Sequence, residues 1–293
     1  MSFTILTDTS CNLPQELVDS FDLTMVPLRY FLDGEERTSY TDGKQADFQA
    51  FYEAMRSGKV VTTTLASQAE AATIATACAE AGNDLLYLGF SSGLSGTFDA
   101  CAAAIAEVAK KYPERKLYSV DTLAASAGQG LLIAYVARMR DEGATIEECR
   151  DWAQSHRLNI CHWFTVDDLM FLKRGGRVSA VSAVFGTALA IKPVMHMDEA
   201  GTLKVVSKVR GRKKAIASLA DHFGMSVDTM DPAQQMVYIS HGDCLEDAQE
   251  LASILKERYG IADPLITYVD PVIGAHSGPG TLALFYYDKI DHR

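Results

Sequence analysis

Residues 84–112 read DLLYLGFSSGLSGTFDACAAAIAEVAKKY, and this stretch decides the fold class. Its first seven residues form a short apolar run of the kind expected for a buried strand. From residue 95 onward the segment is rich in good helix formers and predicts a helix. The two are joined by a few glycines and serines. A strand followed closely by a helix is the repeating unit of an α/β fold with a parallel sheet.

The same alternation extends to both sides of that stretch. Strands are predicted at residues 4–7, 23–32 and 116–122. Helices that end at glycine are predicted at residues 46–58, 67–82 and 125–143. Helical connections place helices on both faces of such a sheet. We therefore expect a helix-covered parallel sheet in the N-terminal half.

The pattern changes after about residue 157. Two strand-like runs, 191–198 and 203–210, are predicted to form a hairpin because the turn sequence DEAG stands at their junction. Further strands and one long helix follow before the C-terminus. The prediction is an α/β protein of two α/β domains, residues 1–157 with a parallel sheet and residues 158–293 with a mixed sheet.

Composition and charge exclude several classes of function. The formal net charge of −11 argues against a nucleic-acid-binding surface. The chain has no run of 18 apolar residues and no basic-then-apolar leader at its start, so we expect a cytoplasmic protein with at most transient membrane contact. The six cysteines lack metal-like spacing, and no metal or cofactor is expected.

Hydroxyl-rich loops follow three of the predicted strands, at residues 7–10, 89–97 and 120–126. Ligands of parallel sheets bind beyond the carboxyl ends of the strands. Glycines permit close approach of the backbone, and hydroxyls supply hydrogen-bond donors for an anion. The loop at 89–97 does not match the phosphate-binding patterns GxxxxGK[ST] or GxGxxG, and a carboxylate is the other natural anion. Its hydroxyls, Ser92 and Ser95 among them, either bind such a ligand or only cap the following helix.

Other polar clusters are candidates for the same site. The run VVTTTLAS at 60–67 ends in hydroxyls before a helix, and LKRGGRVSA and KVRGRKKA form two local basic patches at 172–180 and 208–215. His276 lies in the sequence IGAHSGPGT, and a histidine in a Gly-Pro loop is more often turned toward a ligand than one on a helix face. The small residues Ala180, Ala183, Gly186 and Ala188 either line an alkyl tunnel or serve ordinary helix packing.

A self-contained hydrolase is the main alternative. An acyl or phosphoryl hydrolase would use Asp8, Asp121 or His276, and Asp8 and Asp121 each follow a strand, where a base or nucleophile could stand. His241, at another strand end, is a second histidine that either faces a ligand or serves loop packing. The aspartates could equally serve as acceptors that orient loop hydroxyls and amides.

Five blocks, taken in order, resemble the signature blocks of the DegV family: GFSSGLSGTFDA, VDTLAASAGQG, DDLMFLKRGGRVSA, IKPVMHMDEAGTLKVVSKVRGRKKA and GAHSGPGTLAL. The resemblance covers essentially the whole chain. It implies a two-domain α/β protein that binds one long-chain fatty acid between its domains. It further implies a fatty-acid-binding subunit without catalysis of its own, which presents the carboxylate to a separate ATP-binding fatty acid kinase subunit for conversion to an acyl phosphate used in phospholipid synthesis. A lipid sensor of the same fold without a kinase partner is a further alternative.

The resemblance also implies site residues. The carboxylate ligands it implies are Thr62 or Thr63, Ser92 with Gly93, Ser95, and His276. Arg177 and Arg210 correspond to a basic edge near the ligand mouth, where a partner would dock. This chain reads TTTLASQ where the family usually has Thr-Ser-Gln, so which threonine of residues 62–64 faces the carboxylate is left open.

Overall fold

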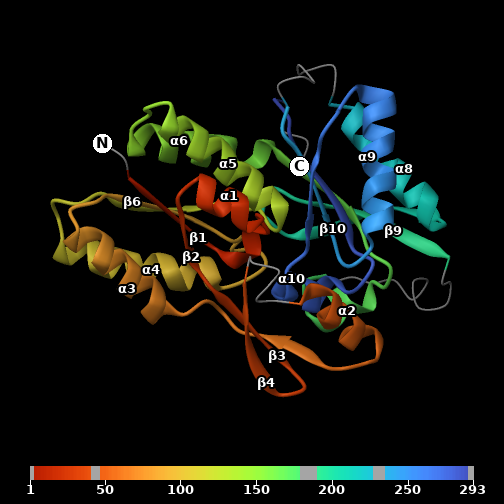
Figure 1. Cartoon of the computed structure of the whole chain (residues 1–293), viewed down its shortest axis with the longest axis horizontal. Coiled ribbons are helices and arrows are strands. Elements are labelled where there is room, and N and C mark those ends of the chain that lie inside the picture. The colour runs from red at the N-terminus through yellow and green to blue at the C-terminus, as the bar shows by residue number, and fades with distance from the viewer. Residues whose placement is uncertain (1–2, 41–46, 179–189, 227–234, 290–293) are drawn as a thin grey trace.

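The computed structural model describes residues 3–40, 47–178, 190–226 and 235–289. The stretch predicted as a small-residue helix, with Ala180, Ala183, Gly186 and Ala188, lies outside these ranges. Within them the chain forms three sheets with helices between and around them (Figure 1). No helix of the described residues is long and apolar enough to cross a membrane.

The N-terminal part is built on a four-stranded parallel sheet in the order β2-β1-β6-β7. Its strands are β1 (Thr4–Asp8), β2 (Leu23–Val26), β6 (Leu85–Gly89) and β7 (Leu117–Asp121). Successive side chains of a strand point to opposite faces. Tyr87 of β6 therefore joins one core with α3 (Gln68–Glu80) and α4 (Thr97–Lys111), while Leu88 joins another with the helices of the opposite face. The predicted helix-covered parallel sheet is confirmed.

The opposite face is covered by α5 (Ala127–Asp141) and α6 (Ile146–His156). Helix α5 is almost entirely buried because its other side packs on the C-terminal sheet. Helix α6 was not among the predicted helices, although its start carries a capping box in which Thr145 and Glu148 bond reciprocally.

The C-terminal part is built on a six-stranded sheet in the order β10-β9-β8-β13-β11-β12. The sheet is mixed, as predicted. Its strands are β8 (Ile160–Thr165), β9 (Ile191–Met197), β10 (Leu203–Arg210), β11 (Val237–His241), β12 (Leu265–Tyr268) and β13 (Leu282–Tyr287). Strands β9 and β10 form the predicted hairpin. Helices α8 (Arg212–Gly224) and α9 (Leu245–Tyr259) cover the face turned away from α5.

The predicted strand 23–32 is wrong as a single strand. It divides at Pro27 into β2, which joins the parallel sheet, and β3 (Leu28–Leu32), which joins a separate antiparallel sheet. Proline has no N–H for a ladder bond and a fixed φ, so the chain can change sheets there. The three strands of this small sheet are β3, β4 (Glu35–Ser39) and β5 (Val61–Thr63), in the order β4-β3-β5.

The remaining helices are short, and two of them bring the C-terminal part against the small sheet. Helix α10 (Pro271–Ser277) packs beside β3, β5 and α2 (Phe48–Arg56). Helix α7 (Met170–Arg174) lies next to α10. The bounds of the remaining elements are α1 (Gln15–Ser20) and the 3-10 turns Thr9–Cys11 and Arg157–Asn159.

Candidate ligand-binding site

A cavity of about 950 Å³ lies where the small sheet, α10 and the C-terminal sheet meet. Its wall is mainly apolar, with Phe90, Leu94, Phe164, Met197 and Phe285 among its side chains. The cavity has the size and character of pockets that hold an apolar small molecule. No Asp or Glu stands in this wall as far as the chain is described, whereas Lys59, Arg174 and Arg177 do.

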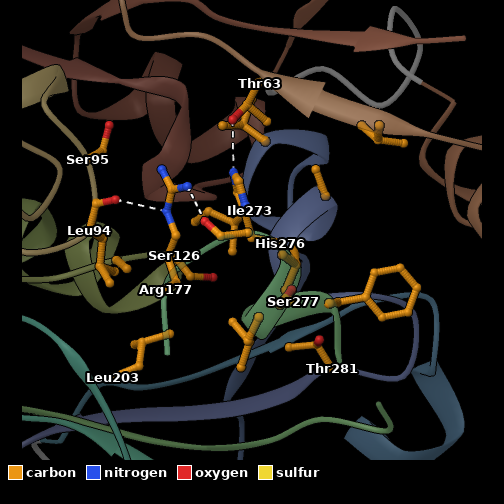
Figure 2. Close-up of a pocket in the computed structure, with 18 of the residues that line it drawn as sticks. Thr63, Leu94, Ser95, Ser126, Arg177, Leu203, Ile273, His276, Ser277 and Thr281 are labelled. Atoms are coloured by element: carbon orange, nitrogen blue, oxygen red, sulfur yellow. Dashed lines mark hydrogen bonds between the residues drawn. The ribbon is translucent and has the colours of Figure 1, made fainter. Parts of the chain in front are cut away.

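His276 and Thr63 meet in this wall. Thr63 Oγ1 and His276 Nε2 are 2.9 Å apart, which joins β5 to α10 across 213 residues of sequence. Figure 2 shows the two side chains pointing toward each other, with Arg177 beside them. The expected Gly-Pro loop is wrong in detail, because His276 lies in the last turn of α10 and the loop begins only at Gly278. The preceding Asp270 and Pro271 supply the N-cap and the first helical position that start this helix.

Burial keeps His276 uncharged. Burial, and after it the neighbouring Arg177 charge, lower the pKa of this imidazole to about 4. At neutral pH the ring therefore carries one proton. With that proton on Nε2, His276 donates to Thr63 Oγ1 and leaves the Thr63 hydroxyl proton free for a ligand.

The burial of His276 predicts an acid-sensitive contribution to stability. The pKa of this group is lower in the folded than in the unfolded chain, so the unfolded chain binds the proton first, and stability falls as the pH drops from about 6.5 toward 4. We expect His276→Gln to reduce this loss by on the order of 2–3 kcal/mol. Urea unfolding of parent and variant at several pH values measures it, and parallel pH profiles would contradict the assignment.

Arg177 is a half-buried cation that has no counter-ion among the described residues. Its Nε donates to Leu94 O at 3.0 Å, and a terminal nitrogen donates to Gly175 O. None of the carboxylates in the described chain forms an ion pair with it, and burial alone lowers its pKa. Arginine nevertheless stays charged. An anionic ligand in the cavity would supply a counter-charge for this guanidinium.

Gly175 permits this grouping. A Cβ on Gly175 would stand 2.3 Å from His276 Nδ1, so only glycine allows the end of α7 to approach the imidazole this closely. The same residue accepts the hydrogen bond from Arg177. The GGR sequence therefore places the cation and the histidine together.

The hydroxyl loop contributes fewer side chains than expected. Ser95 stands in the cavity wall, and its hydroxyl also bonds Thr97 at the start of α4, so it takes part in capping as well. Ser92 and Gly93 are exposed and do not belong to the wall. A Cβ on Gly93 would lie 2.4 Å from Ala200 O, which shows that this glycine allows the loop to pack on the β9–β10 turn.

The threonine run reaches the cavity through all three members, Thr62, Thr63 and Thr64. Only Thr63 bonds to His276. Arg210, by contrast, lies at the exposed end of β10 and is not part of the wall.

Asp8 and Asp121 of the hydrolase alternative lie apart from the cavity, as does His241, whereas His276 stands in the cavity wall. Asp8 is fully buried and accepts hydrogen bonds from Ser10 and from Phe90 N at 3.1 Å. Asp121 accepts from Ser92 N and Leu123 N. His241 Nδ1 lies 3.3 Å from Cys244 N. None of the three belongs to the cavity wall. The two aspartates orient loops, which was the second of the two roles considered for them.

Asp270 was missed in the sequence, yet it holds α10 in place. It is buried and accepts hydrogen bonds from Asn12 Nδ2, Ser39 Oγ, Val272 N and Ile273 N at 2.9–3.2 Å. The Asp-Pro-Val sequence at 270–272 carries the signal for a helix start, but the long-range partners have no local signature.

Comparison with known proteins shows to which family the chain belongs. The model of the DegV family, described as "Uncharacterised protein, DegV family", matches residues 2–289. The chain belongs to the DegV family. A DegV domain-containing protein of Clostridium perfringens is 38% identical over 284 residues, which are 97% of each chain.

Solved DegV structures share the two-domain α/β fold. A fatty-acid-binding DegV family protein from Thermus thermophilus superposes with a TM-score of 0.87 at 27% identity, covering 98% of this chain and 100% of that one. A fatty-acid-binding DegV family protein from Streptococcus agalactiae gives 0.84 at 28% identity, covering 99% and 100%. This DegV chain therefore has the family fold over its whole length.

Proposed function

We propose that this DegV protein binds one long-chain fatty acid in the cavity, with the carboxylate at Thr63, His276 and Arg177 and the alkyl chain along the apolar wall. The observation that carries the proposal is an apolar cavity whose wall holds cations and no carboxylate, in a protein of net charge −11. The fatty-acid-binding relatives from Thermus thermophilus and Streptococcus agalactiae support the same ligand class.

The energetics suit such a ligand. Each buried methylene contributes about 0.8 kcal/mol, so a chain of about sixteen carbons gains roughly 12 kcal/mol before the cost of association. The carboxylate would lose its hydration on entry, and a cation with neutral donors replaces that hydration. In this proposal Arg177 supplies the charge, and Thr63 supplies a hydroxyl donor.

We extend the proposal to a carrier role. The protein presents the bound carboxylate to an ATP-binding fatty acid kinase subunit in the cytoplasm and does not phosphorylate it alone, with residues 1–157 and 158–293 as its two domains. The sequence resemblance supports this role, and exposed Arg210 with Lys213 and Lys214 offers a basic surface outside the cavity. A hydrolase that uses Asp8 or Asp121 is not favoured, because both lie outside the cavity wall. His276, the third candidate, is proposed instead to position the carboxylate.

The ligand is tested by denaturing extraction of the purified protein followed by mass spectrometry. We expect one long-chain fatty acid for each protein molecule. Recovery of no fatty acid, together with no binding of added palmitate by delipidated protein, would contradict the proposed ligand.

The carrier role is tested with Mg-ATP and palmitate. We expect the protein alone to consume no ATP, and we expect acyl phosphate to appear when the cognate kinase subunit is added. ATP-dependent turnover by this chain alone would overturn the carrier role. Absence of turnover with the kinase subunit, while palmitate still binds, would favour the lipid-sensor alternative.

A further inference from the structure

The inner wall of the cavity carries four hydroxyl side chains that the proposed carboxylate site does not use. These are Ser126, Ser240, Ser277 and Thr281, here called the inner hydroxyl strip. Each is more than nine-tenths buried. Buried polar groups need hydrogen-bond partners, and an unsubstituted alkyl chain offers these hydroxyls none.

The strip is contiguous. Ser126 Oγ and Ser240 Oγ are 2.9 Å apart. Ser240 of β11 faces Ala283 of β13, and Thr281 lies two residues before Ala283, so the three share one face of the sheet. Thr281 Oγ1 donates to Gly278 O at 2.8 Å, which brings it against the residue that follows Ser277. Figure 2 accordingly shows Ser277 between His276 and Thr281.

The strip has spare hydrogen-bonding capacity. Ser126 donates to Asn12 Oδ1 at 2.7 Å, so the proton between Ser126 and Ser240 comes from Ser240, whose lone pairs stay available. Thr281 likewise keeps its acceptor capacity after donating to Gly278. Ser277 Oγ is buried and has no hydrogen-bond partner within the described residues. Such an orphan hydroxyl in a folded protein calls for an explanation.

We propose that the cavity selects fatty acids that carry a hydroxyl group on the acyl chain, in the half nearer the carboxylate. The inference rests on the proposed fatty-acid function and narrows its substrate class. Ser277 donates to the ligand hydroxyl, and the ligand hydroxyl donates to Ser240 or Thr281. The oxygen of Ser277 is itself covered, so it reaches the ligand by a χ1 rotation between staggered rotamers.

The position of the hydroxyl follows from the chain. Ser277 directly follows His276, and the Cα atoms of consecutive residues are about 3.8 Å apart. A carboxylate held at His276 therefore brings the first part of the acyl chain, and not its end, to the strip. A hydroxyl at the far end of the chain would instead lie away from the strip and lose its hydration without gaining a partner.

The test uses delipidated full-length protein and isothermal titration with palmitate, 3-hydroxypalmitate and 16-hydroxypalmitate, and with stearate and 7-hydroxystearate. We expect at least one of the acids with an inner hydroxyl to bind about tenfold more tightly than its unsubstituted parent, since a neutral hydrogen bond contributes a factor of this order. The terminally hydroxylated acid should bind no more tightly than palmitate. Ser277→Ala should remove the preference, measured as the ratio of the two affinities in the same variant. Ser253→Ala, on the exposed face of α9, is the matched control and should keep the preference.

The outcomes are distinct. Equal or weaker binding of both inner-hydroxyl acids by the parent protein would overturn the inference, as would a preference that survives in Ser277→Ala. Either result would mean that a bound water, and not a ligand hydroxyl, is the hydrogen-bond partner of Ser277. Failure of palmitate itself to bind would instead contradict the proposed fatty-acid function.

Discussion

Arg177→Met is expected to weaken palmitate binding about 100-fold, because a buried carboxylate loses its charged partner. Folding should be little affected, since Arg177 has no counter-ion in the described chain and methionine fills similar space. Arg177→Lys should recover part of the affinity, because the charge remains but the planar fork of donors is lost. Isothermal titration measures the affinities, and urea unfolding measures the stability.

Arg210→Met is the matched control for that experiment. It removes an equal charge from the exposed end of β10, outside the cavity wall, and should leave palmitate affinity unchanged. The account would be contradicted if Arg177→Met bound palmitate as tightly as the parent. Equal losses of palmitate affinity in the two variants would show that Arg177 acts only through the long-range electrostatic potential of the protein.

Asp270→Ala is expected to reduce the free energy of unfolding by about 3 kcal/mol or more, because four donors lose their buried acceptor. Two of these donors, Asn12 and Ser39, belong to the N-terminal part, so the change also loosens α10 and His276 with it. Palmitate binding should weaken in the same variant. Urea unfolding and isothermal titration measure the two effects.

Asp47→Ala is the control for Asp270→Ala. Asp47 also caps a helix, α2, with its carboxylate, but it is exposed, and among the described residues it accepts only from Ala50 N, at 2.9 Å. Its loss should cost about 1 kcal/mol. If the two variants lost equal stability, the interdomain bonds of Asp270 would add nothing beyond an ordinary cap.

The sequence predicted the fold class because local periodicity carries it. The strand and helix around residues 84–112 and the hairpin of β9 and β10 are read directly from apolar spacing and turn residues. The split at Pro27 was missed because the two halves are both strands and differ only in the sheet they join. That choice depends on distant partners, as in the pairing of Phe31 with Thr62.

The candidate site was predicted by residue type more than by orientation. Thr63, Ser95 and His276 stand in one wall, but nothing local separates Ser92, which is exposed, from Ser95, which faces the cavity. Arg177 was expected at a docking edge, and the structure sets it beside His276 because Gly175 allows the close approach. Contacts of this kind join segments about a hundred residues apart and leave no mark on either sequence.

A crystal structure of the protein with palmitate is the most direct test of the central claim, that the carboxylate binds at Thr63, His276 and Arg177. The account predicts a carboxylate within hydrogen-bond distance of Thr63 Oγ1 and the Arg177 guanidinium, with the alkyl chain along the apolar wall of the cavity. A carboxylate placed against Ser240 and Thr281 with the chain reversed, or a fatty acid bound outside the cavity, would contradict it.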